Sequence, residues 1–175
     1  MMGQCHTFLG EVALHQKRFS LAREHLEAGL RLVQRVGVIR LMVTTQRFLG
    51  DLALAEGKYG EAARIYDALL ERYTFGHLDD KPSLARTLLS KALLLMRTKR
   101  LPEAVQLLEG SVALYKEAGN VRRSVGTSLV LVRAYAQRGS WWRACRLFLS
   151  TLTMAFVAGL LRPRRLLVFL SMHSM

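Results

Sequence analysis

Apolar residues recur along the chain at the three- and four-residue spacing of an amphipathic helix. In one segment the apolar positions include Leu49, Leu52 and Ala53, and in the next they include Ala62 and Leu69. A short polar stretch separates the two segments. The pattern predicts two helices joined by a tight turn, and few segments favour strands, so we expect an all-α fold.

This two-helix pattern occurs four times. A small residue marks each copy at spacings of 40, 42 and 40 residues: Ala22, Ala62, Ala104 and Ala144. A bulky residue three positions earlier has the same spacing and is predicted to fill the junction between the helices: Phe19, Tyr59, Leu101 and Trp141. A glycine is predicted to end each copy in the left-handed conformation: Gly37, Gly76, Gly119 and Gly159. Such periodicity is typical of a repeat array.

The array is expected to span residues 3–159, with repeats at about 3–37, 43–76, 85–119 and 125–159. Residues 160–175 form an apolar and basic C-terminal tail that is too short for another repeat. Because the chain starts inside the first helix of a repeat, we expect it to be a fragment or isoform of a longer scaffold.

The marked positions resemble those of the tetratricopeptide repeat family. Leu9-Gly10 and Leu49-Gly50 match the Leu-Gly pair of the family's first helix, and the four marker alanines match the small residue of its second helix. Lys91 departs from the pattern, since leucine is expected there. The period of 40 to 42 residues resembles the extended form found in kinesin light chains, polarity scaffolds, anaphase-promoting-complex subunits and bacterial transcription regulators. The resemblance implies an α-solenoid of about four antiparallel helix-turn-helix repeats in a right-handed superhelix.

The resemblance also implies a non-enzymatic protein-interaction scaffold whose first helices line a concave groove. Its register places ten residues in that groove: Thr7, Glu11, Arg47, Asp51, Arg86, Leu89, Leu93, Arg97, Leu129 and Arg133. This mixture is acidic at its start and apolar and basic further on, so we expect an acidic-hydrophobic segment of a partner protein or peptide. The family's clamp for a C-terminal carboxylate needs Lys and Asn on the first helix, where Thr7 and Glu11 stand, so we expect no such clamp.

Two further functions stay open, and the distribution of charge bears on the first of them. The net charge is +13, and residues 118–175 hold nine arginines and no acidic residue. Such a segment is compatible with a module that binds RNA or anionic lipid. Nucleic acid is disfavoured because aromatic residues are not interleaved with the basic ones, apart from Trp141 and Trp142 beside Arg143. The other alternative is the helical sensor of a transcription regulator.

Nothing in the sequence indicates catalysis, a cofactor or a metal. The chain has no GxxxxGK[ST], GxGxxG or GxSxG motif, and its five histidines lack ligand spacing. We expect Cys5 and Cys145 to be small buried residues. The uncharged run at residues 147–161 is shorter than the roughly 20 residues of a membrane span. With no secretory leader in the sequence, we expect a cytoplasmic or nuclear protein, with a place in a multi-subunit complex also open.

Overall fold

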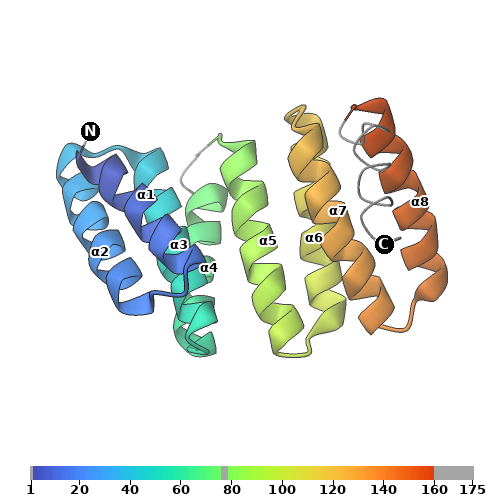
Figure 1. Cartoon of the computed structure of the whole chain (residues 1–175), viewed down its shortest axis with the longest axis horizontal. Coiled ribbons are helices and arrows are strands. Elements are labelled where there is room, and N and C mark those ends of the chain that lie inside the picture. Colours follow the sequence, from blue (N-terminus) through green and yellow to red (C-terminus); the bar gives the residue numbers. More distant parts are fainter. Residues whose placement is uncertain (1, 76–78, 160–175) are drawn as a thin grey trace, which may run out of the picture.

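The structure is a computed structural model that describes residues 2–75 and 79–159. Its elements are eight helices in chain order: α1 (Met2–His15), α2 (Phe19–Val36), α3 (Ile39–Ala55), α4 (Tyr59–Phe75), α5 (Lys81–Arg97), α6 (Leu101–Glu117), α7 (Val121–Gln137) and α8 (Trp141–Val157). Figure 1 shows them side by side along the long axis of the molecule, from α1 and α2 at one end to α7 and α8 at the other. The fold is therefore an all-α solenoid, as predicted.

Each predicted repeat is one antiparallel helix pair, and consecutive helices pack against each other throughout. The first helices α3, α5 and α7 begin at Ile39, Lys81 and Val121, four residues before the predicted repeat starts at 43, 85 and 125. Side-chain caps account for two of the early starts. Asp80 and Asn120 each accept a hydrogen bond from a backbone N–H of the first turn, over 3.2 Å in both cases. These polar residues lie outside the apolar pattern, so the pattern places the helix starts too late.

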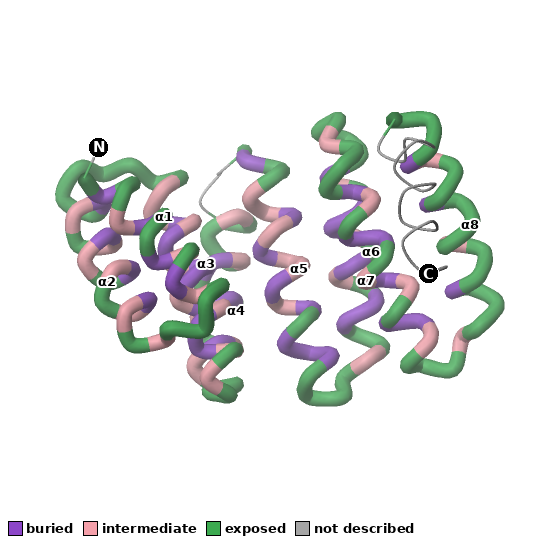
Figure 2. Tube along the Cα trace, in the orientation of Figure 1, coloured by how far each residue is buried: buried purple, intermediate pink, exposed green. Residues whose placement is uncertain are grey.

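The marker alanines lie at the contacts between helices. Ala22, Ala62 and Ala104 are 0% exposed and Ala144 is 4% exposed. In Figure 2 such buried positions recur along the helices with exposed positions between them. Gly50 shows how close the second repeat is packed, because a Cβ atom there would lie 2.6 Å from Cε1 of Tyr66. Small residues at these contacts are thus required by the distance between the helices.

The prediction for the bulky residues is wrong at two positions. Tyr59 is 41% and Trp141 is 66% exposed. Both are the first residue of a helix, and a helical side chain leans toward the N-terminal turn, which here is the open connection. Phe19 and Leu101 are partly buried and pack against the core.

The left-handed glycines are confirmed where the structure describes them. Gly37, Gly119 and Gly159 have φ angles of 74°, 66° and 65°, whereas Gly76 lies outside the described residues, as does the tail at 160–175. A second left-handed position occurs in the turn inside every repeat, five residues before the marker alanine: Lys17, Gly57, Lys99 and Gly139, with φ of 59°, 78°, 64° and 80°. The sequence pattern did not reveal it because glycine fills only two of these four positions.

The prediction for the cysteines is also wrong, since Cys5 and Cys145 are both exposed. Cys5 lies two residues from the buried Gly3 and Thr7, which is about half a turn around the helix. Cys145 lies one residue after the buried Ala144 and therefore also faces away from the contact.

Candidate functional site

The predicted groove residues all lie on the first helices of the repeats, α1, α3, α5 and α7. We call the surface of these four helices the helix-A face. Part of it is exposed to solvent. Leu93 is 37% and Leu129 is 45% exposed, while Arg97 and Arg133 are exposed and form no ion pair with any described residue. Leu89, in contrast, is partly buried against the core. The helix-A face therefore offers apolar and cationic side chains to solvent.

Two of the predicted residues are held by the fold. Arg47 forms an ion pair with Asp51 one turn later, and its guanidinium Cζ lies 4.1 Å from the ring centroid of Phe48. The Arg47 side chain is only 7% exposed. Asp51 also accepts a hydrogen bond of 2.7 Å from the hydroxyl of Tyr66 on α4. The charge of Arg47 is thus present at the helix-A face, but its side chain is fixed in place.

Thr7 is placed differently from the other predicted residues. It is 2% exposed, and its Oγ1 lies 2.8 Å from Oγ1 of Thr45 and donates to the carbonyl of Gly3. Its hydroxyl therefore joins α1 to α3 and is not open to a ligand. Glu11, one turn later on α1, is half-buried and forms no ion pair within the described chain.

Near Arg86, itself a predicted groove residue, lie two residues that the sequence did not single out: Arg123 on α7 and Tyr115 on α6. Arg86 is half-buried, and its pKa is lowered by burial and then by the positive charges of Arg47 and Arg123. Burial raises the pKa of Tyr115, a residue 1% exposed, against the opposing effect of the same arginines. We call Arg47, Arg86 and Arg123, with Tyr115, the arginine cluster. The sequence does mark the position of Tyr115, because a tyrosine stands eleven residues after the marker alanine in both the second and the third repeat: Tyr73 and Tyr115.

A hollow lies elsewhere, between α6, α7 and α8. It has a volume of about 720 Å³ and is lined by apolar side chains together with the charged residues Glu109, Lys116, Arg143 and Arg146. Tyr135 closes part of it by donating a hydrogen bond to Glu109. Nothing in the sequence pattern predicts this hollow.

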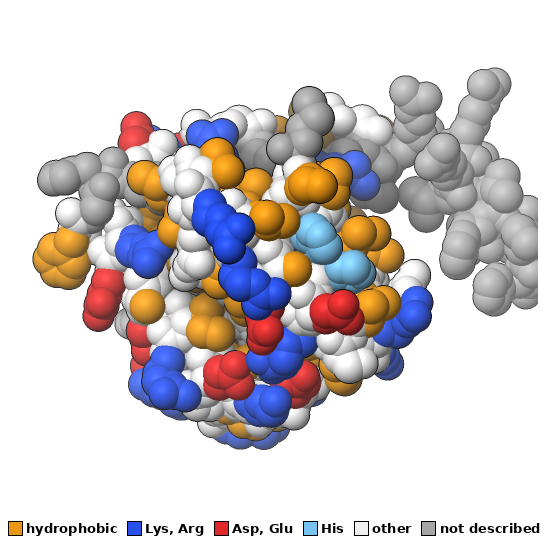
Figure 3. Space-filling view, turned by 90° about the vertical axis from the view of Figure 1, so that its left-hand side faces the viewer, with side chains coloured by type: hydrophobic (Ala, Val, Ile, Leu, Met, Phe, Trp, Pro, Cys, Tyr) orange, Lys and Arg blue, Asp and Glu red, His pale blue; other side chains and the backbone are white. Residues whose placement is uncertain are grey.

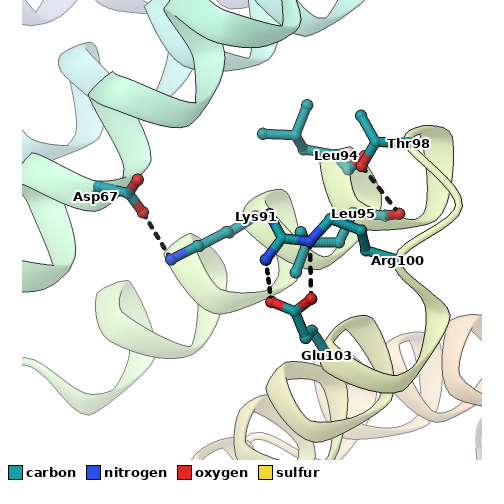
Figure 4. Close-up of polar contacts among 7 residues, drawn as sticks. All are labelled: Asp67, Lys91, Leu94, Leu95, Thr98, Arg100 and Glu103. Carbon is teal, nitrogen blue, oxygen red and sulfur yellow. Dashed lines mark hydrogen bonds and ion pairs between the residues drawn. The ribbon is translucent and has the colours of Figure 1, made fainter.

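A smaller hollow of about 380 Å³ lies where the second and third repeats meet. Figure 4 shows Lys91 on α5 reaching Asp67 on α4, over 2.6 Å, beside the ion pair of Arg100 and Glu103. This contact explains why lysine is accepted at the position where the family pattern has leucine. Its charged groups are paired with one another, so the hollow offers no free charge to a ligand.

The N-terminal end carries histidines among hydrophobic side chains (Figure 3). Nδ1 of His6 lies 3.2 Å from Nδ1 of His25, and their ring centroids are 5.3 Å apart. No group of three or more metal-ligating side chains occurs in the part of the chain that the structure describes. The pair therefore lacks the further protein ligands of a structural metal site.

Among the described helices, none is both long enough and apolar enough to cross a membrane.

Comparison with known proteins bears on the fold. Residues 41–117 match a family model described as tetratricopeptide repeat. No curated protein matches the chain. One similar solved structure is a Podosopora anserina protein described as a kinesin light chain, whose TPR-like repeats are nearly identical to one another. It is 21% identical to this chain with a TM-score of 0.72, and the match covers 91% of this chain and 76% of that one.

Two further structures have the same arrangement. Rap protein, solved in complex with competence and sporulation factor, is 16% identical with a TM-score of 0.79, and the match covers 89% of this chain and 44% of that one. BtubC from P. vanneervenii is 18% identical with a TM-score of 0.75, and the match covers 92% of this chain and 66% of that one. At such identities the likeness concerns the fold.

Proposed function

Because this chain is a tetratricopeptide repeat protein, we propose that it is a non-enzymatic scaffold that binds a segment of a partner protein on its helix-A face. One observation carries the proposal. Successive first helices present the partly exposed apolar side chains of Leu93 and Leu129 beside Arg97 and Arg133, which form no ion pair within the described chain. Apolar side chains next to unpaired cations suit a segment that is both acidic and hydrophobic.

A structural neighbour gives support by analogy. Rap protein, of which 44% has this arrangement of helices, is solved in complex with competence and sporulation factor. Proteins of one fold differ in function, and the side chains of the helix-A face decide what this one binds. The scaffold is proposed to act in the cytoplasm or nucleus, with a multi-subunit complex as its setting.

The test is a selection of short random peptides on the intact chain, followed by measurement of their dissociation constants by fluorescence polarisation. The Leu93→Glu and Leu129→Glu double variant is expected to weaken binding by about tenfold or more, since it places charge on the apolar part of the helix-A face. The matched control is Leu149→Glu with Val157→Glu, which are 63% and 85% exposed on α8. Circular dichroism checks that both variants stay helical. Equal weakening by the control, or none by either variant, would move the binding surface away from the helix-A face.

The arginine-rich half makes anion binding the second candidate. Residues 118–175 contain nine arginines and no acidic residue. Binding of RNA or anionic vesicles falls steeply with added salt because neutralised charges release counterions. A salt titration of RNA, anionic vesicles and the selected peptides separates the two functions. RNA or vesicle binding that persists at physiological salt and exceeds peptide binding would favour the second.

A further inference from the structure

The arginine cluster brings like charges together from three successive first helices. Arg47 lies on α3, Arg86 on α5 and Arg123 on α7. Counted back from the marker alanine of their own repeats, they stand 15, 18 and 21 residues earlier. Each is therefore almost one turn nearer to the N-terminus of its helix than the one before. The positive charges of Arg47 and Arg123 both lower the pKa of Arg86, so Arg86 has a like charge near it from each neighbouring first helix.

The protein compensates these charges only in part. Arg47 is paired with Asp51. Arg86 and Arg123 form no ion pair with any residue that the structure describes. Glu11 is the acid that acts on Arg86, and its effect is smaller than that of either neighbouring arginine. A half-buried guanidinium beside two further cations is unfavourable without a counter-charge, because burial removes the water that would solvate it.

Two donors of the cluster are also unsatisfied. Nη2 of Arg47 and the hydroxyl of Tyr115 are closed to water and have no hydrogen-bond partner. Their residues are 6% and 1% exposed. Buried donors in native proteins almost always have an acceptor, so these two donors leave the positive charge around Arg86 further uncompensated.

We propose that the arginine cluster is an anion site that receives a carboxylate or phosphoryl group from a side chain of the bound partner segment. This inference rests on the function proposed above and specifies its chemistry. Arg86 is partly exposed and Arg123 is exposed, so the anion reaches these two from solvent, while the buried guanidinium of Arg47 adds positive potential. Guanidinium groups bind both carboxylate and phosphoryl oxygens with two parallel hydrogen bonds. Leu89, one turn after Arg86, favours an apolar residue beside the anionic one.

The experiment measures two fluorescent probe peptides against the full chain: an oligoglutamate peptide and the same peptide with one central phosphoserine. The site variant is Arg86→Gln with Arg123→Gln. The control is Arg122→Gln with Arg31→Gln, which changes the net charge equally at exposed positions without ion pairs in the described structure. At moderate salt the site variant is expected to weaken binding by about tenfold or more, and the control by about twofold or less. Arg86→Lys keeps the charge but loses the planar guanidinium that donates two parallel hydrogen bonds. It is therefore expected to keep only part of the affinity that Arg86→Gln loses.

The outcomes are distinguishable. Tighter binding of the phosphoserine probe would identify a phosphoryl group as the ligand, and equal or weaker binding would identify a carboxylate. Equal losses in the site variant and the control would show attraction by diffuse charge and overturn the site, as would the absence of binding by both probes. Selected peptides that respond to Leu93→Glu with Leu129→Glu but ignore Arg86→Gln with Arg123→Gln would overturn the anion site and leave the scaffold function standing. Peptides that ignore both variants would overturn the function itself.

Discussion

The hydroxyl of Tyr66 donates a 2.7 Å hydrogen bond to Oδ1 of Asp51, while the other carboxylate oxygen of Asp51 pairs with Arg47. The aspartate therefore connects the inner side of α4 to a charge on the helix-A face. Tyr66 is fully buried, and burial is the largest of the effects that raise the pKa of its hydroxyl, followed by the charge of Asp51. The tyrosine consequently remains a neutral hydrogen-bond donor under ordinary conditions.

Tyr66→Phe removes this hydrogen bond and keeps the ring. We expect a loss of about 1–2 kcal/mol in the free energy of unfolding, since the acceptor is charged. Urea unfolding followed by circular dichroism measures the loss. Tyr59→Phe is the control, because Tyr59 is 41% exposed and should change stability little. Equal stabilities of the two variants would contradict the role given to the Asp51 contact.

Ala62→Leu places a large side chain at a contact where Ala62 is fully buried. Overpacking is expected to lower stability by about 1–3 kcal/mol. Ala104→Leu should behave in the same way, because it occupies the equivalent place in the third repeat. Ala68→Leu on the same helix is the control, since Ala68 is exposed. An unchanged thermal midpoint for Ala62→Leu would refute the repeat register.

Lys99 adopts a left-handed conformation at the turn position that Gly57 and Gly139 fill in other repeats. A non-glycine residue is strained there, so Lys99→Gly is expected to stabilise the protein by about 0.5–1 kcal/mol. The thermal midpoint should rise by a few degrees, at about 2–4 °C per kcal/mol for a chain of this size. The reverse change, Gly139→Ala, should lower the midpoint. A lower midpoint for Lys99→Gly would show that the lysine side chain contributes more than its backbone conformation costs.

Thr7 and Thr45 join α1 to α3 through their hydroxyl groups, 2.8 Å apart. Thr7→Val is expected to cost about 1 kcal/mol because it leaves a buried hydroxyl with fewer partners. Adding Thr45→Val should cost less than the sum of the two single changes, since the two residues share one contact. Strict additivity in a double-mutant cycle would mean that the hydroxyl groups do not interact.

Glu56 accepts contacts from Lys58 and Arg23, each over 2.7 Å, and these lower the pKa of its carboxyl group. A lowered pKa means that the unfolded chain binds the proton more tightly. The stabilisation is therefore present above the unfolded pKa of Glu56 and is lost as the pH falls through its lower folded pKa. Urea unfolding of the native chain and of Glu56→Gln at several pH values should show their stability difference shrinking in acid. A difference that does not vary with pH would argue against the ion pairs.

Much of the fold could be predicted from the sequence because a repeat imposes a period. The marker alanines must lie at helix contacts that admit only a small side chain, and their spacing of 40, 42 and 40 residues records that requirement four times. The left-handed glycines at helix ends repeat for a similar reason, since few other residues adopt that backbone conformation without strain. The apolar pattern does not predict the helix starts at Lys81 and Val121, because the polar capping residues Asp80 and Asn120 determine them.

Tertiary structure decided which residues of the helix-A face are available to a partner. A register assigns Thr7 and Arg47 to this face, but it does not show that Thr45 binds the first and that Asp51 holds the second. Arg123 and Tyr115 belong to different repeats from Arg47, so only the stacking of the helices brings their charge and hydroxyl into its neighbourhood. The sequence by itself determined the repeat, because packing constraints recur with the period. The arginine cluster was decided by the fold, because the placement of side chains from different repeats near one another leaves no periodic trace in the sequence.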